Sequence, residues 1–173
     1  MSGSEDASGR AFVRASREYL SGEYVPKIGR CLDRLDRTDV WWRPNDACNS
    51  VGNLLLHLAG NTRQWIVSGV GGAKDVRRRS REFDRDEGDP EELFRRLRET
   101  VSEACGVLEE LDPADLDQSR TIQGQEVTVR DAVYHVVEHF SMHTGQIVYV
   151  TKLRTGRDLG FYRVEDGIAE ENW

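Results

Sequence analysis

Apolar side chains recur every three or four residues along most of the chain, which is the spacing of an amphipathic helix. Four segments follow this period, at residues 10–37, 50–69, 90–111 and 129–153. Pro26 lies inside the first segment and is expected to kink or divide that helix, because proline has no backbone N–H to donate. No strand pattern supports a Rossmann fold, a barrel or a sandwich, so the sequence predicts an all-α protein.

Residues typical of helix ends mark where these segments begin. Asn49 or Ser50 can cap the second helix with its side-chain oxygen, and Asp89 is expected to cap the third. Thr128 and Asp131 fit a capping box at the start of the fourth helix. The caps therefore agree with the boundaries that the apolar period predicts.

The connections differ in length and composition. Residues 70–88 are glycine-rich and then strongly charged, which is typical either of a solvated linker or of a functional loop. Residues 119–127 are expected to form a short extended loop or hairpin around Gly124. Four long helices with one long crossover between the second and third describe a four-helix bundle.

The length of 173 residues favours one domain. We expect residues 1–9 to be a disordered lead-in and residues 10–155 to form the bundle. Residues 156–173 are expected to be a tail that packs back on the bundle through its larger side chains, Phe161, Tyr162, Ile168 and Trp173.

Composition narrows the class of protein. With 31 acidic and 24 basic side chains the net charge is −7, which argues against binding to nucleic-acid phosphates. No apolar run approaches the roughly 18–20 residues of a membrane-spanning helix, and the N-terminus lacks the features of a signal peptide. The three cysteines are widely spaced and form no CxxC motif, so they indicate neither a disulfide framework nor a zinc knuckle. These observations favour a cytoplasmic protein that acts on a small molecule, with no nucleic-acid or membrane partner.

Three of the four histidines, His135, His139 and His143, follow one another at intervals of four residues. Residues at this spacing are one helical turn apart on the same face, so neighbouring imidazoles can reach one metal ion. At 100° per residue, His143 lies within roughly 40° of the centre of the apolar face, His139 within roughly 80° and His135 near roughly 120°. His143 and His139 therefore point toward the interior or its rim, whereas His135 is better placed to support them or to be solvated.

The fourth histidine, His57, lies near one edge of the apolar face of the second helix. We therefore predict one metal ion held by His57, His139 and His143, with the remaining positions open to water or substrate, as in catalytic metal sites. Spacing alone leaves the metal undecided, with zinc first and nickel, iron, cobalt and manganese as alternatives. The competing interpretation is a set of core histidines bonded to the backbone or to neighbouring acids.

Several polar residues are candidates to support the histidines by bonding a ligand or a metal-bound water. They are His135, Gln146 and Asn61. Glu138 lies 100° round the helix from His139 and is expected at the surface. A group of arginines in the long connection could clamp an anionic thiol or carboxylate, although none is favoured individually: Arg77, Arg78, Arg79 and Arg81.

Two stretches carry a resemblance to a known family. Residues 50–61, with the sequence Ser-Val-Gly-Asn-Leu-Leu-Leu-His-Leu-Ala-Gly-Asn, are followed by Trp65, and residues 135–147 combine the histidine pattern with His-Thr-Gly-Gln-Ile. Together they resemble the DinB/YfiT-like metalloenzyme superfamily over roughly residues 12–155. Residues 65–72, the arginines that follow and Glu82-Phe83 resemble a branch of unknown function.

The resemblance implies an up-down-down-up four-helix bundle, often a homodimer, with a divalent metal held by three histidines. Its triad falls on His57, His139 and His143, and His135 matches an extra histidine one turn earlier. The superfamily often has arginine after the last histidine, where this chain has Thr144.

Characterised relatives include transferases and isomerases that use low-molecular-weight thiols such as bacillithiol, mycothiol or glutathione. The resemblance therefore implies a metal-dependent transferase that joins a thiol to a small electrophile. A metal-dependent hydrolase and a non-catalytic metal-binding bundle are the alternatives.

Overall fold

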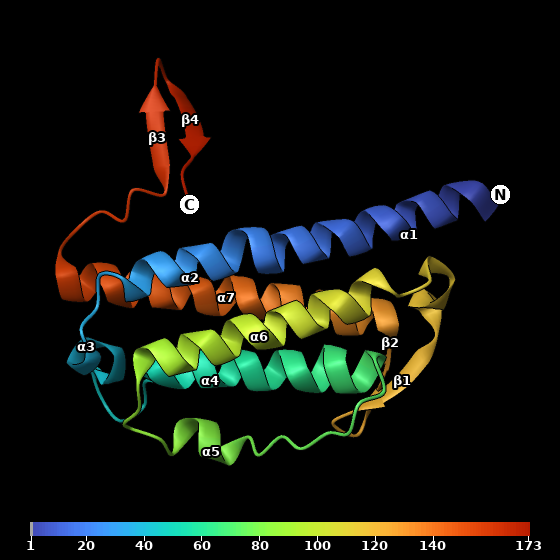
Figure 1. The fold of residues 1–173 in the computed structure, drawn as a ribbon, viewed down its shortest axis with the longest axis horizontal. Helices are drawn as coiled ribbons and strands as arrows, with labels where there is room; N and C mark the ends of the chain where they lie inside the picture. The colour runs from blue at the N-terminus through green and yellow to red at the C-terminus, as the bar shows by residue number, and fades with distance from the viewer. Residues whose placement is uncertain (1) are drawn as a thin grey trace.

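Four long helical stretches lie side by side in the computed structural model, which describes residues 2–173 and the side chains from residue 6 onward (Figure 1). The first stretch consists of α1 (Ser2–Arg17), the π-helical η1 (Glu18–Tyr24) and α2 (Val25–Leu32). The second consists of α4 (Val51–Thr62) and the π-helical η2 (Arg63–Val70). The third is α6 (Pro90–Glu109) and the fourth is α7 (Val129–Thr155). The protein is thus mostly helical, as its apolar period predicts.

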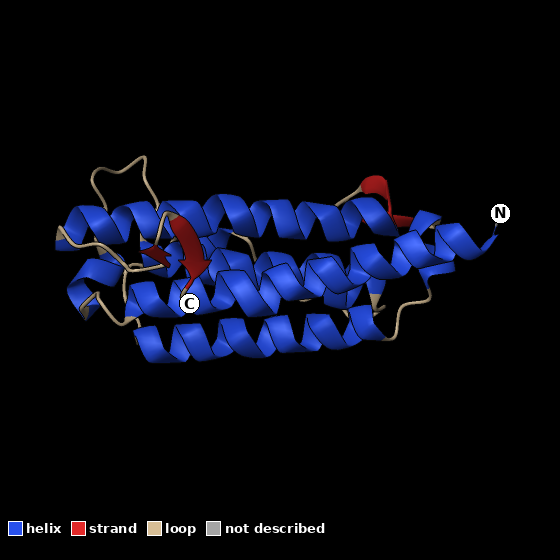
Figure 2. Ribbon diagram, turned by 90° about the horizontal axis from the view of Figure 1, so that it is seen from above, coloured by secondary structure: helices blue, strands red, loops and turns tan. Residues whose placement is uncertain are grey.

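Short elements occupy the connections. The helical ones are α3 (Arg37–Trp41), α5 (Ser80–Phe83) and the 3₁₀ helix η3 (Pro113–Asp117). Among the described residues, strands form two hairpins, which pair β1 (Ser119–Ile122) with β2 (Gln125–Thr128) and β3 (Tyr162–Glu165) with β4 (Ile168–Glu171) (Figure 2). The first hairpin is the one predicted around Gly124. In the part of the chain that the structure covers, no helix is both long and apolar enough to cross a lipid bilayer.

The first helical stretch, which was expected to be kinked or divided at Pro26, changes its type of helix just before this residue. The π-helical segment η1 comes directly before α2, and Pro26 lies in the first turn of α2. Because proline cannot donate a backbone hydrogen bond to the preceding turn, a change to wider π-helical turns lets the helix continue past it. The stretch ends at Leu32, five residues before the predicted end at residue 37, and Asp36 then caps the separate helix α3.

The segment expected to be a disordered lead-in, residues 1–9, is helical from Ser2 onward, and Met1 lies outside the described residues. The buried Gly9 explains the difference, because η3 packs directly against it. A Cβ atom at Gly9 would lie 2.8 Å from the Cβ of Pro113. The first turns of α1 therefore have a tertiary partner that local sequence could not reveal.

The capping predictions differ in outcome. Ser50 caps α4 in a reciprocal capping box with Asn53, and Thr128 caps α7 with Asp131. Asp89 occupies the cap position of α6, but its carboxylate makes no capping hydrogen bond and instead pairs with Arg37 at 3.3 Å.

The capping box at α4 also fixes the long connection. The side-chain amide of Asn53 donates to the backbone carbonyls of Glu82, at 3.0 Å, and Arg85, at 2.6 Å. Near the same end of the molecule, the indole of Trp41 donates to the carbonyl of Gly88 at 3.1 Å. The 70–88 connection therefore runs along the outside of α4 and returns the chain to the end where α4 begins (Figure 1).

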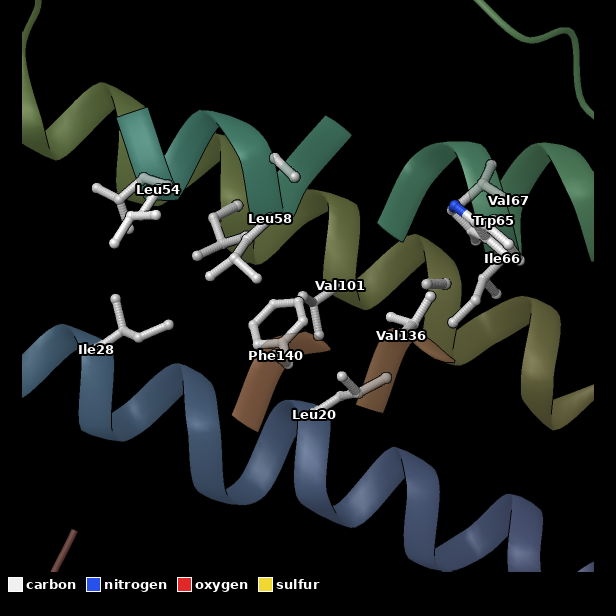
Figure 3. Packing of buried hydrophobic residues seen from close by; sticks show 14 of the residues in the cluster. Leu20, Ile28, Leu54, Leu58, Trp65, Ile66, Val67, Val101, Val136 and Phe140 are labelled. Atoms are coloured by element: carbon white, nitrogen blue, oxygen red, sulfur yellow. The ribbon is translucent and has the colours of Figure 1, made fainter. Parts of the chain in front are cut away.

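The hydrophobic core positions α4 against α7. Figure 3 shows the ring of Phe140, from α7, between Leu58 of α4 and Leu20 of η1, and all three side chains are completely buried. Burial of side chains of this size contributes roughly 1.5–3 kcal/mol each. Because Leu58 directly follows His57 and Phe140 directly follows His139, the same packing determines where these two histidines lie.

The C-terminal tail packs only in part. Phe161 is buried, and the ammonium group of Lys27 lies 3.7 Å from the centre of the Trp173 ring. The other two side chains expected to pack, Tyr162 and Ile168, are exposed on the hairpin that projects from the helices (Figure 1). A two-stranded hairpin has two solvent-facing sides, so its alternating residues find no core to enter.

The substitution Ser50→Ala is expected to lower the free energy of unfolding by about 1 kcal/mol, because it removes the cap of a buried helix start. Urea unfolding followed by circular dichroism measures the change. The matched control is Ser102→Ala, an exposed position of α6, which is expected to change stability by less than about 0.5 kcal/mol. Equal effects of the two substitutions would contradict the role of the cap.

Candidate metal centre

Three histidines from two helices converge on one point. The Nε2 atom of His139 lies 3.0 Å from Nε2 of His57 and 3.1 Å from Nε2 of His143. One ligand atom from each ring lies within 4.8 Å of the other two. His57 and His143 are buried, while His139 keeps part of its side chain at the surface. The structure thus brings together the three residues that the sequence predicts.

The carboxylate of Glu82 determines which nitrogen of His57 carries the proton. Its Oε2 atom lies 2.8 Å from Nδ1 of His57, and an ionised carboxylate can only accept a hydrogen bond. Nδ1 therefore donates, and the lone pair of His57 is on Nε2, which faces His139. The guanidinium of Arg77 approaches the same Nδ1 at 3.1 Å, but it cannot donate to a nitrogen that already carries a proton.

Arg77 holds Glu82 in place through two parallel hydrogen bonds. Nε of Arg77 donates to Oε1 at 2.8 Å and Nη2 donates to Oε2 at 2.9 Å. Both side chains are buried. They lie against the backbone of α4 at Gly60, where an added Cβ atom would be only 2.1 Å from Oε1 of Glu82. Glycine at this position therefore lets the ion pair reach His57.

His143 is oriented in the same way by a neighbour on its own helix. Nδ1 of His143 lies 2.7 Å from Oε1 of Gln146, so this nitrogen donates and Nε2 again carries the lone pair. Nδ1 of His139 is buried and has no hydrogen-bond partner among the described residues. Two nitrogens with lone pairs thus face His139, whose single proton can serve only one of them.

A metal cation could accept the lone pairs that the single proton of His139 leaves without a partner. Nitrogen ligands at about 2.0–2.1 Å from a tetrahedral zinc ion are about 3.3 Å apart, close to the 3.0 and 3.1 Å found here. In metal sites the second nitrogen of a histidine ligand usually donates to a carboxylate or carbonyl, as those of His57 and His143 do. The three histidines could therefore hold a metal ion.

The surroundings of His139 and His143 favour the neutral form of both imidazoles. Burial, together with the nearby rings of His143 and His57, lowers the pKa of His139 to about 3. Burial likewise lowers the pKa of His143. Burial alone would raise the pKa of the Glu82 carboxyl, but hydrogen bonds from Arg77 and His57 outweigh this effect and lower it. Neutral imidazoles such as these two are the form in which histidine binds a metal.

His135 lies beside the cluster but does not join it. Its ring packs on Trp65 with centroids 4.1 Å apart, and its Nε2 atom lies 3.2 Å from the amide nitrogen of Asn61. Asn61 is buried, and its carbonyl oxygen has no partner among the residues described. The expected supporting residues therefore split into two groups, with Gln146 on a predicted ligand and Asn61 on His135.

Three further residues differ in their exposure to solvent. Glu138 is exposed, as expected from its helical phase. Cys31 is buried, and burial raises the pKa of its thiol to about 11, which agrees with a filler rather than a nucleophile. Thr144 is buried next to His143, and its hydroxyl has no partner within the described part of the chain.

From the sequence, Arg77 was predicted only as one of four arginines that could clamp an anion, and Glu82 entered only through the family resemblance; neither was predicted to contact the histidines. Glu82 lies 25 residues after His57, in a connection without helical periodicity. Its local pattern is a single acid beside an aromatic residue within a run of arginines. That pattern is equally typical of a solvated linker.

Comparison with protein-family models assigns the chain to a family. A family model described as a protein of unknown function (DUF1572) matches residues 7–166, so the chain belongs to this family. The family is part of the DinB/YfiT-like superfamily, in agreement with the resemblance seen in the histidine motifs. No curated protein matches the chain.

The substitution Glu82→Gln is expected to weaken Zn²⁺ binding by about 10- to 100-fold, because it removes the charge that orients His57 and raises its basicity. Competition against a chromogenic chelator measures the affinity, and thermal melting checks that the variant is folded. The control is Glu87→Gln, at an exposed position of the same connection. Unchanged affinity in a folded Glu82→Gln variant would show that the carboxylate does not act on the centre.

In protein treated with a chelator, His139 is expected to stay neutral through the range near pH 6.5 in which free histidine titrates, since its pKa is about 3. Between these values the unfolded chain binds more protons, so the free energy of unfolding falls as the pH is lowered through this window. Histidine NMR spectra and urea unfolding at several pH values measure both effects. The substitution His139→Asn should flatten the pH dependence, whereas titration of His139 near pH 6.5 would contradict the assignment.

Proposed function

We propose that this protein is a divalent-metal-dependent enzyme that transfers a low-molecular-weight thiol to a small electrophile. The observation that carries the proposal is the convergence of three Nε2 atoms, two of them on rings whose Nδ1 atoms already donate to Glu82 and Gln146. Such prior orientation of the rings is typical of metal ligands. Three protein ligands also leave coordination positions for a substrate, as catalytic metal sites do.

In this mechanism His57, His139 and His143 hold the metal, with zinc as the first choice and nickel, iron, cobalt or manganese as alternatives. A divalent metal bound there would lower the pKa of a thiol or a water and so supply a nucleophile near neutral pH. Glu82 keeps the proton of His57 on Nδ1, and Gln146 does the same for His143. The thiol loses its proton to solvent, its sulfur forms a bond to the electrophilic carbon, and the leaving group departs with the electron pair of the broken bond.

The superfamily adds two further proposals. The helices are proposed to form the up-down-down-up bundle of that class, which the return of the 70–88 connection along α4 supports. The protein is also proposed to act as a homodimer. Thr144 stands where the superfamily often has arginine, so the proposal assigns no role to a side chain at this position.

A metal-dependent hydrolase is the second candidate, and His135 favours it. Burial lowers the pKa of this histidine, and its ring centre lies 5.4 Å from that of His139. A neutral imidazole next to the metal ligands is suited to take a proton from an attacking water. A metal-binding bundle without catalysis is the third candidate.

Protein purified without a tag or chelator is expected to contain about one equivalent of a divalent metal, which His57→Ala and His143→Ala should each lose. Elemental analysis measures the content. The control is His135→Ala, which should keep the metal because His135 lies outside the triad. The proposal fails if the unmodified protein binds no metal even after zinc or nickel is added.

Turnover assays then separate the candidates. A transferase requires an added thiol, so activity toward a small electrophile should appear with bacillithiol, mycothiol or glutathione and be absent without it. A hydrolase would cleave an ester or amide with no thiol present. Metal binding with neither activity would favour the non-catalytic bundle.

A further inference from the structure

A cavity of about 620 Å³ adjoins the metal centre between α4, the 70–88 connection and α6. Leu56 and Ala59 of α4 contribute apolar surface to it, and Arg77 and Glu82 form part of its wall. None of the three converging histidines lines it. Its volume falls in the range of small-molecule sites, roughly 300–1,000 Å³. The cavity is therefore a separate compartment that shares one ion pair with the histidine cluster.

The wall of this cavity is rich in arginine. Two of the arginines are neutralised by acids that also line it, since Arg77 pairs with Glu82 at 2.8 Å and Arg63 pairs with Glu103 at 2.5 Å. Two other acids line the cavity. Glu99 pairs with Arg95, which is not part of the wall, and Asp75 accepts hydrogen bonds from the side chain of Gln64 and the backbone N–H of Arg77. The acids of the cavity therefore leave part of its positive charge without a partner.

Four further arginines carry this remaining charge. One of them, Arg85, donates from Nε to the backbone carbonyl of Glu87. The other three have no partner among the described residues. Arg78 precedes α5, Arg81 lies within it and Arg96 lies on α6, and all three line the cavity. Their side chains make no hydrogen bond or ion pair with any residue that the structure describes. These three arginines are exposed to solvent and give the hollow a positive charge, in a chain whose net charge is −7. An anion bound among them would neutralise part of that charge.

We propose that the cavity binds a small organic anion with two or more negative charges, held by Arg78, Arg81 and Arg96. The guanidinium group presents a planar fork of donors that matches both carboxylate and phosphate oxygens, so the shared chemistry is a polyanion of either kind. The apolar wall of α4 contacts the carbon skeleton of the ligand. This site does not depend on the metal, because no proposed metal ligand contributes to it.

Isothermal titration calorimetry with two probes, pyrophosphate and tricarballylate, tests the proposal. The titrations use the full-length chain carrying His139→Ala, so that neither probe can be held through a metal. At least one probe is expected to bind, and the tighter one identifies phosphate or carboxylate as the preferred group. The double substitution Arg81→Gln/Arg96→Gln should weaken that binding by at least about tenfold.

The control is Arg43→Gln/Arg157→Gln, which removes the same charge at two exposed positions outside the cavity. Retained affinity in the control, with loss in the cavity variant, supports the site. An equal loss in both variants would mean attraction by overall charge and would overturn the proposal, as would the absence of binding by either probe. Because the histidine triad is already broken in this background, failure here leaves the metal proposal intact, and failure of the metal proposal leaves this one intact.

Discussion

The buried chain of hydrogen bonds from Arg77 through Glu82 to His57 is the constraint on which the site depends. An ionised carboxylate placed away from water is unfavourable by several kcal/mol unless its oxygens are paired. Here Arg77 donates to both oxygens and His57 donates to one of them. Once Glu82 is buried, the connection that carries it has little freedom, and the amide of Asn53 fixes the same segment through its backbone.

This constraint determines the chemistry of the histidine cluster. With Nδ1 of His57 committed to Glu82, the lone pair of Nε2 must face His139, and Gln146 imposes the same orientation on His143. The rings of His57 and His143 are therefore oriented by groups outside the cluster. A site prepared in this way loses less entropy when it binds a ligand, which is the general advantage of preorganisation.

Residues of the 70–88 connection contribute to both the histidine cluster and the neighbouring cavity. Glu82 and Arg77 contact the histidine cluster on α4, while Arg78 and Arg81, from the same short stretch, line the neighbouring cavity. Its high charge, which in the sequence was typical either of a solvated linker or of a functional loop, is thus divided between a buried ion pair and an arginine-lined wall. A charged connection can be ordered in this way when part of its charge is paired within the fold.

The sequence by itself determined the helical stretches, the capping box at Thr128, a cap at Asn49 or Ser50 for the second helix, and the placing of His139 and His143 on one face of one helix. These features are local, because a helix sets its own period and its ends are satisfied by residues three positions away. Only the tertiary structure decided that Glu82 reaches His57, that Gly9 packs on η3 and that the C-terminal hairpin projects into solvent. Each of these depends on how a non-periodic segment crosses the molecule, and its path is fixed by buried polar and apolar contacts between residues far apart in the chain.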